Sequence, residues 1–85
     1  MIYLFEAEHV THNQIVKLVK ELEAKNIVVE FARSDATFSD CLFMIVTCEA
    51  PVAMSIRHSI WEINGGLCCE MSIISQETLE AYTEE

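Results

Sequence analysis

The sequence predicts an α+β fold in which one strand–helix–strand unit occurs twice. The residues at 2–5 (Ile-Tyr-Leu-Phe) align without a gap on those at 42–45 (Leu-Phe-Met-Ile), and the residues at 27–30 align on those at 67–70, in both cases 40 positions later. Between these segments each unit carries apolar residues at helical spacing. Two such units in succession give the element order βαββαβ.

The first unit begins with a strand over residues 2–8 and continues into a helix. Thr11 is expected to cap this helix, because a glutamine three residues later can reach back to the cap. Apolar residues then follow one side of the helix and charged residues the other, until Asn26 ends it. A β-branched strand over residues 27–33 and a polar connection over residues 34–40 complete the unit.

The second unit opens with a strand over residues 41–48 that is almost entirely apolar, which is typical of a central strand. Pro51 suits the first turn of the following helix, where its missing N–H costs nothing. The glycines at 65–66 end that helix. A last strand over residues 67–74 is followed by a short C-terminal helix that runs to about residue 83.

These elements predict a ferredoxin-like sandwich, with a four-stranded antiparallel sheet in the order 4-1-3-2, two helices on one face and a short C-terminal helix in addition. A chain of 85 residues can bury one modest core, so residues 1–85 are expected to form a single domain. Side-chain alternation assigns each strand residue to a face. The residues expected to face the two helices are Tyr3, Phe5, Ile27, Val29, Phe31, Phe43, Ile45, Leu67, Cys69, Met71 and Ile73.

The other face of the sheet, called the open face below, is expected to be too apolar for water. Its apolar residues, predicted to form an interface, are Leu4, Val28, Leu42, Met44, Val46 and Cys68, ringed by Glu6, Glu30 and Glu70. Monomers rarely expose apolar patches beyond a few hundred Å². We therefore expect a second copy, the C-terminal helix or another protein to cover this face, and a homodimer is the preferred prediction.

Charge and composition exclude several classes of function. Fourteen acidic residues against five basic ones give a net charge of −9, and a polyanion repels phosphate backbones, so direct nucleic-acid binding is not expected. No apolar run approaches the roughly 18 residues of a membrane span. Glu6 and Glu8 stand where a secretory signal would be basic, so a cytoplasmic location is expected.

The same charge indicates a protein partner with a basic surface. An alternative function follows, in which the chain is an acidic inhibitor, such as a phage-type anti-defence protein or nucleic-acid mimic, that blocks a basic site on a nucleic-acid enzyme.

The four cysteines are expected to be reduced structural thiols. They are Cys41, Cys48, Cys68 and Cys69, and three of them lie within apolar strand patterns. The chain has no CxxC pair, so neither a zinc site nor another cofactor is predicted.

Three polar residues between the first strand and the first helix form the candidate ligand site: Glu8, His9 and His12. Helix N–H groups nearby favour a small anionic ligand. A metal is not expected, because three ligands from one loop lack a fourth. His9 or His12 acting as an acid or base is the enzymatic alternative. No nucleophile stands next to a base, however, so a non-enzymatic role is preferred.

The chain resembles the ACT-like regulatory domains over about residues 2–74. The resemblance is carried by the segment 25–27 (Lys-Asn-Ile) leading into a strand, the strand 41–48, and the glycines 65–66 before the last strand. It implies a βαββαβ module that pairs through its sheets or edges and binds amino acids or other small effectors. We therefore predict a small regulatory module that acts through protein association and can bind a small effector.

Overall fold

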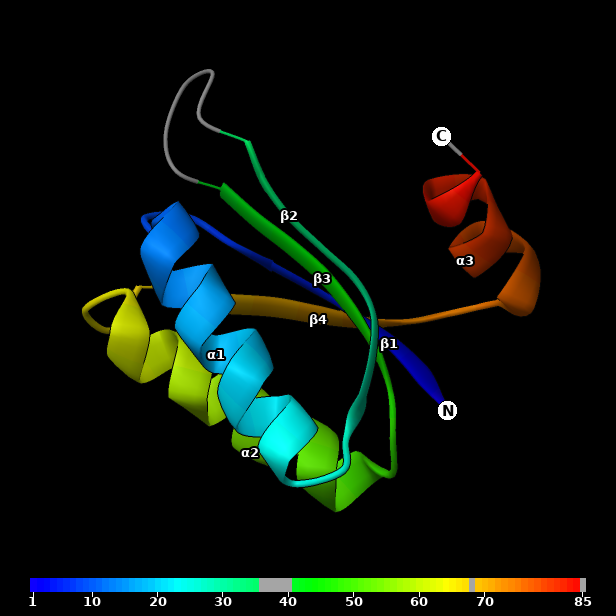
Figure 1. Ribbon diagram of the computed structural model, residues 1–85, viewed down its shortest axis with the longest axis horizontal. Helices are drawn as coiled ribbons and strands as arrows, with labels where there is room; N and C mark the ends of the chain where they lie inside the picture. Colours follow the sequence, from blue (N-terminus) through cyan, green and yellow to red (C-terminus); the bar gives the residue numbers. More distant parts are fainter. Residues whose placement is uncertain (36–40, 68, 85) are drawn as a thin grey trace.

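The computed structural model describes residues 1–35, 41–67 and 69–84, and in these it shows one antiparallel sheet and three helices (Figure 1). In chain order the elements are β1 (Ile2–Ala7), α1 (His12–Ala24), β2 (Val28–Asp35), β3 (Cys41–Thr47), α2 (Ala50–Ile63), β4 (Cys69–Ile74) and α3 (Gln76–Thr83). The strand order β2-β3-β1-β4 confirms the predicted ferredoxin-like fold. Most of the expected polar connection, residues 36–40, lies outside the described residues.

Local sequence signals set the helix ends. Gln14 donates its backbone N–H to the hydroxyl of Thr11 at 3.3 Å, and Thr11 donates its own N–H to the Gln14 side chain at 2.9 Å, which completes a capping box. Asn26 follows the end of α1 with a left-handed φ of 62°. Pro51 lies in the first turn of α2, and Ser75 caps α3.

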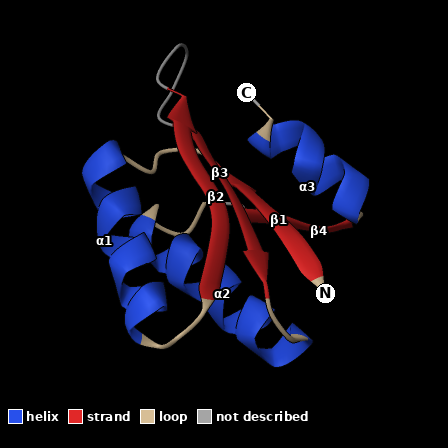
Figure 2. Cartoon of the chain, turned by 45° about the vertical axis from the view of Figure 1, so that its right-hand side comes forward, coloured by secondary structure: helices blue, strands red, loops and turns tan. Residues whose placement is uncertain are grey.

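The sheet separates two unequal apolar layers (Figures 1 and 2). Helices α1 and α2 lie side by side on one face, and α3 lies on the open face. The larger core lies between the sheet and the first two helices. Its fully or almost fully buried members include Phe5, Val10, Ile15, Leu18, Leu22, Ala53, Ile56 and Ile60.

The predicted face of β3 was wrong. Leu42, Met44 and Val46, assigned to the open-face interface, are fully buried beneath α1 and α2, while Phe43 and Ile45 point to the open face. The antiparallel register pairs Phe5 with Met44, so even-numbered residues of β3 share a face with odd-numbered residues of β1. The repeat alignment was offset by one residue, and such an offset moves every side chain to the other face.

Three further residues expected under the helices are placed differently. A register shift between Val29 and Phe31 turns Phe31 to the open face, as a β-bulge does. Ile73 is 60% exposed, because it lies on an edge strand that the helices cover incompletely. Leu67 precedes β4 and is also exposed.

Helix α3 covers part of the open face, which is one of the three predicted covers. Leu79 of α3 packs on Leu4 and Ile45, and the half-buried side chains around them are Ile2, Phe31, Ile74 and Tyr82. The open-face surface assigned to a homodimer is thus partly occupied by the chain itself. Of the other predicted interface residues, Val28 is 57% exposed, and Cys68 lies outside the described residues.

No helix in the described part of the chain is long and apolar enough to cross a membrane.

Candidate functional site

The open face continues beyond α3 as an acidic row of side chains. Glu6 on β1 lies directly opposite Phe43 on β3 and directly opposite Glu70 on β4. Residues that face each other across antiparallel strands lie on the same side of the sheet. The register therefore places two carboxylates and one aromatic ring in a single row, at the end of the sheet that the C-terminal helix leaves uncovered.

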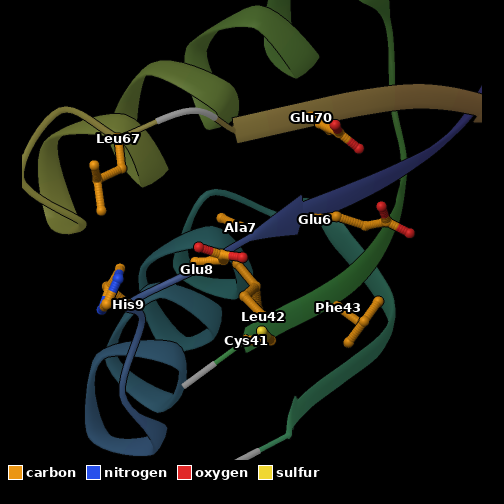
Figure 3. Close-up of a pocket in the computed structure, with 9 residues that line it drawn as sticks. All are labelled: Glu6, Ala7, Glu8, His9, Cys41, Leu42, Phe43, Leu67 and Glu70. Carbon is orange, nitrogen blue, oxygen red and sulfur yellow. The ribbon is translucent and has the colours of Figure 1, made fainter. Parts of the chain in front are cut away.

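A cleft of about 520 Å³ opens over this row (Figure 3). The residues that line it are Glu6, Ala7, Glu8, His9, Cys41, Leu42, Phe43, Leu67 and Glu70. They come from the ends of three strands and from the loops before α1 and before β4. The volume lies within the range of about 300–1,000 Å³ typical of ligand sites.

Asn64 holds the two loops together. Its side-chain amide donates to the Glu8 carbonyl at 3.3 Å, and its side-chain oxygen accepts from the backbone N–H of Leu67 at 3.1 Å. Asn64 is buried, so these bonds satisfy polar groups that would otherwise be costly to bury. The cleft walls formed by Glu8 and Leu67 are therefore fixed relative to each other.

The structure brings two of the three predicted ligand residues into the cleft. Glu8 and His9 line it, whereas His12, the first residue of α1, does not. His9 has a φ of 58°, in the left-handed region, at the turn where the chain leaves β1 for α1. Glu6 and Glu70, which the sequence placed in the acidic ring around the open face, join Glu8 there.

The electrostatics of the cleft favour a cation. Glu6 and Glu70 are direct cross-strand partners, and like charges in that position repel each other. Within the described residues, neither carboxylate forms an ion pair. Glu8 adds a third carboxylate. An anion, expected from the helix N-terminus alone, would meet this repulsion, whereas an ammonium or guanidinium group would relieve it.

The cleft continues toward α3 along an aromatic surface. Phe43 also lines a smaller hollow of about 180 Å³ together with Phe31, Arg33 and Tyr82. The rings of Phe31 and Tyr82 lie 5.8 Å apart in a tilted arrangement. Phe43 therefore joins an acidic region on the β1 and β4 side to an aromatic region beside α3.

His9 and Cys41 are the residues of the cleft that could supply a base and a thiol nucleophile. His9 and Cys41 line the same cleft, but no hydrogen bond joins them within the described chain, and an activated thiol needs such a base. No described group of three His, Cys, Asp or Glu residues could hold a metal ion. Cys48 lies elsewhere, and burial raises the pKa of its thiol, which disfavours the reactive thiolate.

Sequence reasoning missed three residues that shape the cleft. Phe43 was assigned to the core because of the offset in β3, and Cys41 was treated as a structural thiol. Asn64 was overlooked beside the two glycines that follow it. An asparagine at a helix C-terminus is a common cap, so its hydrogen bonds to distant loops leave no mark in the sequence.

The comparisons with known proteins place the chain in no family: no family model, no curated protein and no solved structure matches it.

Proposed function

We propose that the protein is a non-enzymatic binding module whose cleft receives a basic side chain of a protein partner. The observation that carries this proposal is the Glu6–Glu70 cross-strand pair, which forms no ion pair within the described part of the chain and lies beside an aromatic ring. A bound guanidinium group could form charge-assisted hydrogen bonds with both carboxylates. It could also stack on the Phe43 ring.

The arrangement supports recognition of a peptide or protein surface more than of a free amino acid. The cleft is open on one side and continues past Phe43 toward Tyr82, so a chain of several residues can lie along it. Aromatic and charged side chains together are typical of protein-recognition surfaces. The small effector implied by the resemblance to ACT-like domains remains a separate prediction.

The test is a titration of a fluorescein-labelled peptide with three arginines, followed by anisotropy. Combining Glu6→Gln with Glu70→Gln should weaken binding at least about tenfold, which corresponds to roughly 1.4 kcal/mol. The matched control combines Glu21→Gln with Glu23→Gln on the exposed side of α1, which changes the net charge equally. This control should bind within about twofold of the wild type.

Two results would contradict the proposal. Equal losses in both double variants would show that the peptide responds to net charge and not to the cleft. Absence of binding by the wild type at low ionic strength would remove the proposed ligand class altogether.

A second candidate function is the acidic inhibitor, favoured by three carboxylates gathered on one surface of a chain with a net charge of −9. In that case the cleft region would cover a phosphate-binding site on a nucleic-acid enzyme. Inhibition of such an enzyme by the wild type and by the α1 control, but not by the Glu6→Gln, Glu70→Gln variant, would support it. Equal inhibition by both double variants would count against a specific site.

A further inference from the structure

Strand β4 forms one edge of the sheet, and the hydrogen bonds show which of its backbone groups point outward. Met1 and Cys48 exchange both backbone bonds, at 3.1 and 3.0 Å, so the odd-numbered residues of β1 bond to β3. The even-numbered residues of β1 therefore bond to β4, and Leu4 pairs with Ser72. It follows that Cys69, Met71 and Ile73 direct their N–H and C=O groups away from the sheet.

The contact of Arg57 with β4 agrees with this assignment. Arg57 on α2 donates from Nε to the Cys69 carbonyl at 3.1 Å, which is possible only if that carbonyl points outward. No described residue pairs with the outward groups of Met71 and Ile73. An edge strand with free backbone groups is a template for pairing with another strand.

Exposed apolar side chains lie beside this free edge. On β4, Ile73 is 60% exposed; on α2, Met54 and Trp61 are 52% and 47% exposed. A hollow of about 410 Å³ lies between the two elements, lined by Met54, Arg57, His58, Trp61 and Cys69. Trp61 stacks on His58 with the ring centroids 5.8 Å apart. We call this surface, with Met71 and Ile73, the α2–β4 flank.

We propose that the α2–β4 flank binds a second copy of the chain through antiparallel pairing of β4 with β4. Arg57 already forms a hydrogen bond with the Cys69 carbonyl. Met71 and Ile73 are therefore the two residues whose outward N–H and C=O groups have no partner among the described residues. In a symmetric dimer, Met71 and Ile73 of both copies can all form hydrogen bonds if Met71 faces the partner subunit's Ile73. This register places the two-fold axis at Ser72. The two four-stranded sheets then form one continuous sheet.

The size of the flank suits a reversible dimer. Its three exposed apolar side chains present on the order of 300 Å², the scale of apolar patches that are often functional. A standard interface buries roughly 800 Å² per partner, and the flank stays below this area even when the backbone of β4 is included. The dimer should therefore dissociate on dilution.

The charges of the flank also suit a second copy. The charged residues of α2 are Arg57 and Glu62, and the carboxylate of Glu70 on β4 points to the opposite face, so this flank escapes most of the net charge of −9. Repulsion between two acidic chains is therefore weaker at this flank than on the rest of the surface, and salt that screens the remaining repulsion should favour the dimer.

The first test is the solution mass, measured by light scattering over a range of protein concentrations. The wild type should change from monomer to dimer as concentration rises, and Ile73→Glu should remain a monomer at concentrations where the wild type is dimeric. The matched control is Val28→Glu on the opposite edge strand, where a β-branched residue is 57% exposed. A wild-type monomer at all concentrations, or a dimer lost in Val28→Glu and kept in Ile73→Glu, would overturn the proposal.

The second test addresses the register. Residues on the axis of an antiparallel pair that do not exchange hydrogen bonds have Cα atoms about 4.5 Å apart, within the range of a disulfide. Ser72→Cys should therefore form a covalent dimer on mild oxidation, faster than the wild type with its native thiols treated in parallel. Cross-linking of Ser72→Cys no faster than that of the wild type would overturn the proposed pairing.

Discussion

Glu6 and Glu70 face each other across β1 and β4, and this contact sets the character of the cleft. Like charges that face each other across two strands destabilise a sheet, and a neutral residue at either position would remove this repulsion. Unfavourable arrangements of this kind are characteristic of functional sites, where stability and activity conflict. The two carboxylates are therefore explained better by a ligand than by the fold.

A stability measurement follows from that repulsion. Glu6→Gln should raise the free energy of unfolding by about 0.5 kcal/mol, because it removes one of two facing charges. Urea denaturation followed by circular dichroism at low ionic strength measures this change. Glu23→Gln on the exposed side of α1 is the control and should not stabilise the protein. A loss of stability in Glu6→Gln would mean that the carboxylate has a favourable partner and that the cleft does not need a cation.

At the scale of single elements, α3 decides how the open face is used. Leu79 is buried against Leu4 and Ile45, so the helix replaces part of the partner surface that the sequence predicted. Tyr82 of the same helix contacts Phe31 and lines the smaller hollow that Phe43 shares with the cleft. The helix therefore covers part of the sheet and lines the hollow beside the cleft.

Leu79→Ala should lower the free energy of unfolding by about 2–3 kcal/mol, since it leaves a cavity over Leu4. It should also increase binding of the dye ANS, because the open face becomes accessible. Thermal unfolding and ANS fluorescence measure the two effects. Glu80→Ala, an exposed change on the same helix, should leave both unchanged. An unchanged stability in Leu79→Ala would contradict the packing of α3 on the sheet.

Much of the fold follows from the sequence, because local signals agree with one another. Thr11, Pro51 and Ser75 mark helix starts, and the structure has a helix at each. The face of β3 does not follow, because all of its central residues are apolar and alternation carries no information there. The bulge that turns Phe31 outward has no signal in the sequence either.

The candidate site was predicted only in part, because some of its residues are far apart in the sequence and meet only in the folded chain. Glu8 and His9 are adjacent in the chain and were found together, but their partners come from elsewhere. Phe43 joins them only once the antiparallel register is known, and Asn64 only once the two loops are seen side by side.

At the scale of the whole molecule, the net charge of −9 acts in opposite directions on the two proposed interactions. Raising the ionic strength should weaken binding of the arginine peptide, because salt screens attraction over a Debye length of about 10 Å at 0.1 M. The same change should strengthen the dimer, because it screens repulsion between two acidic chains. Anisotropy and light scattering over one salt series measure both trends. If salt changed peptide binding and dimerisation in the same direction, the separate roles of the cleft and the flank would be contradicted.

The most direct test of the account is an NMR titration of the ¹⁵N-labelled protein with the arginine peptide. We predict that the largest amide shifts occur at Glu6, Glu8, His9, Phe43 and Glu70, around the cleft. Shifts spread over α1 and the remaining acidic surface, or concentrated away from the end of the sheet, would contradict the cleft as the binding site.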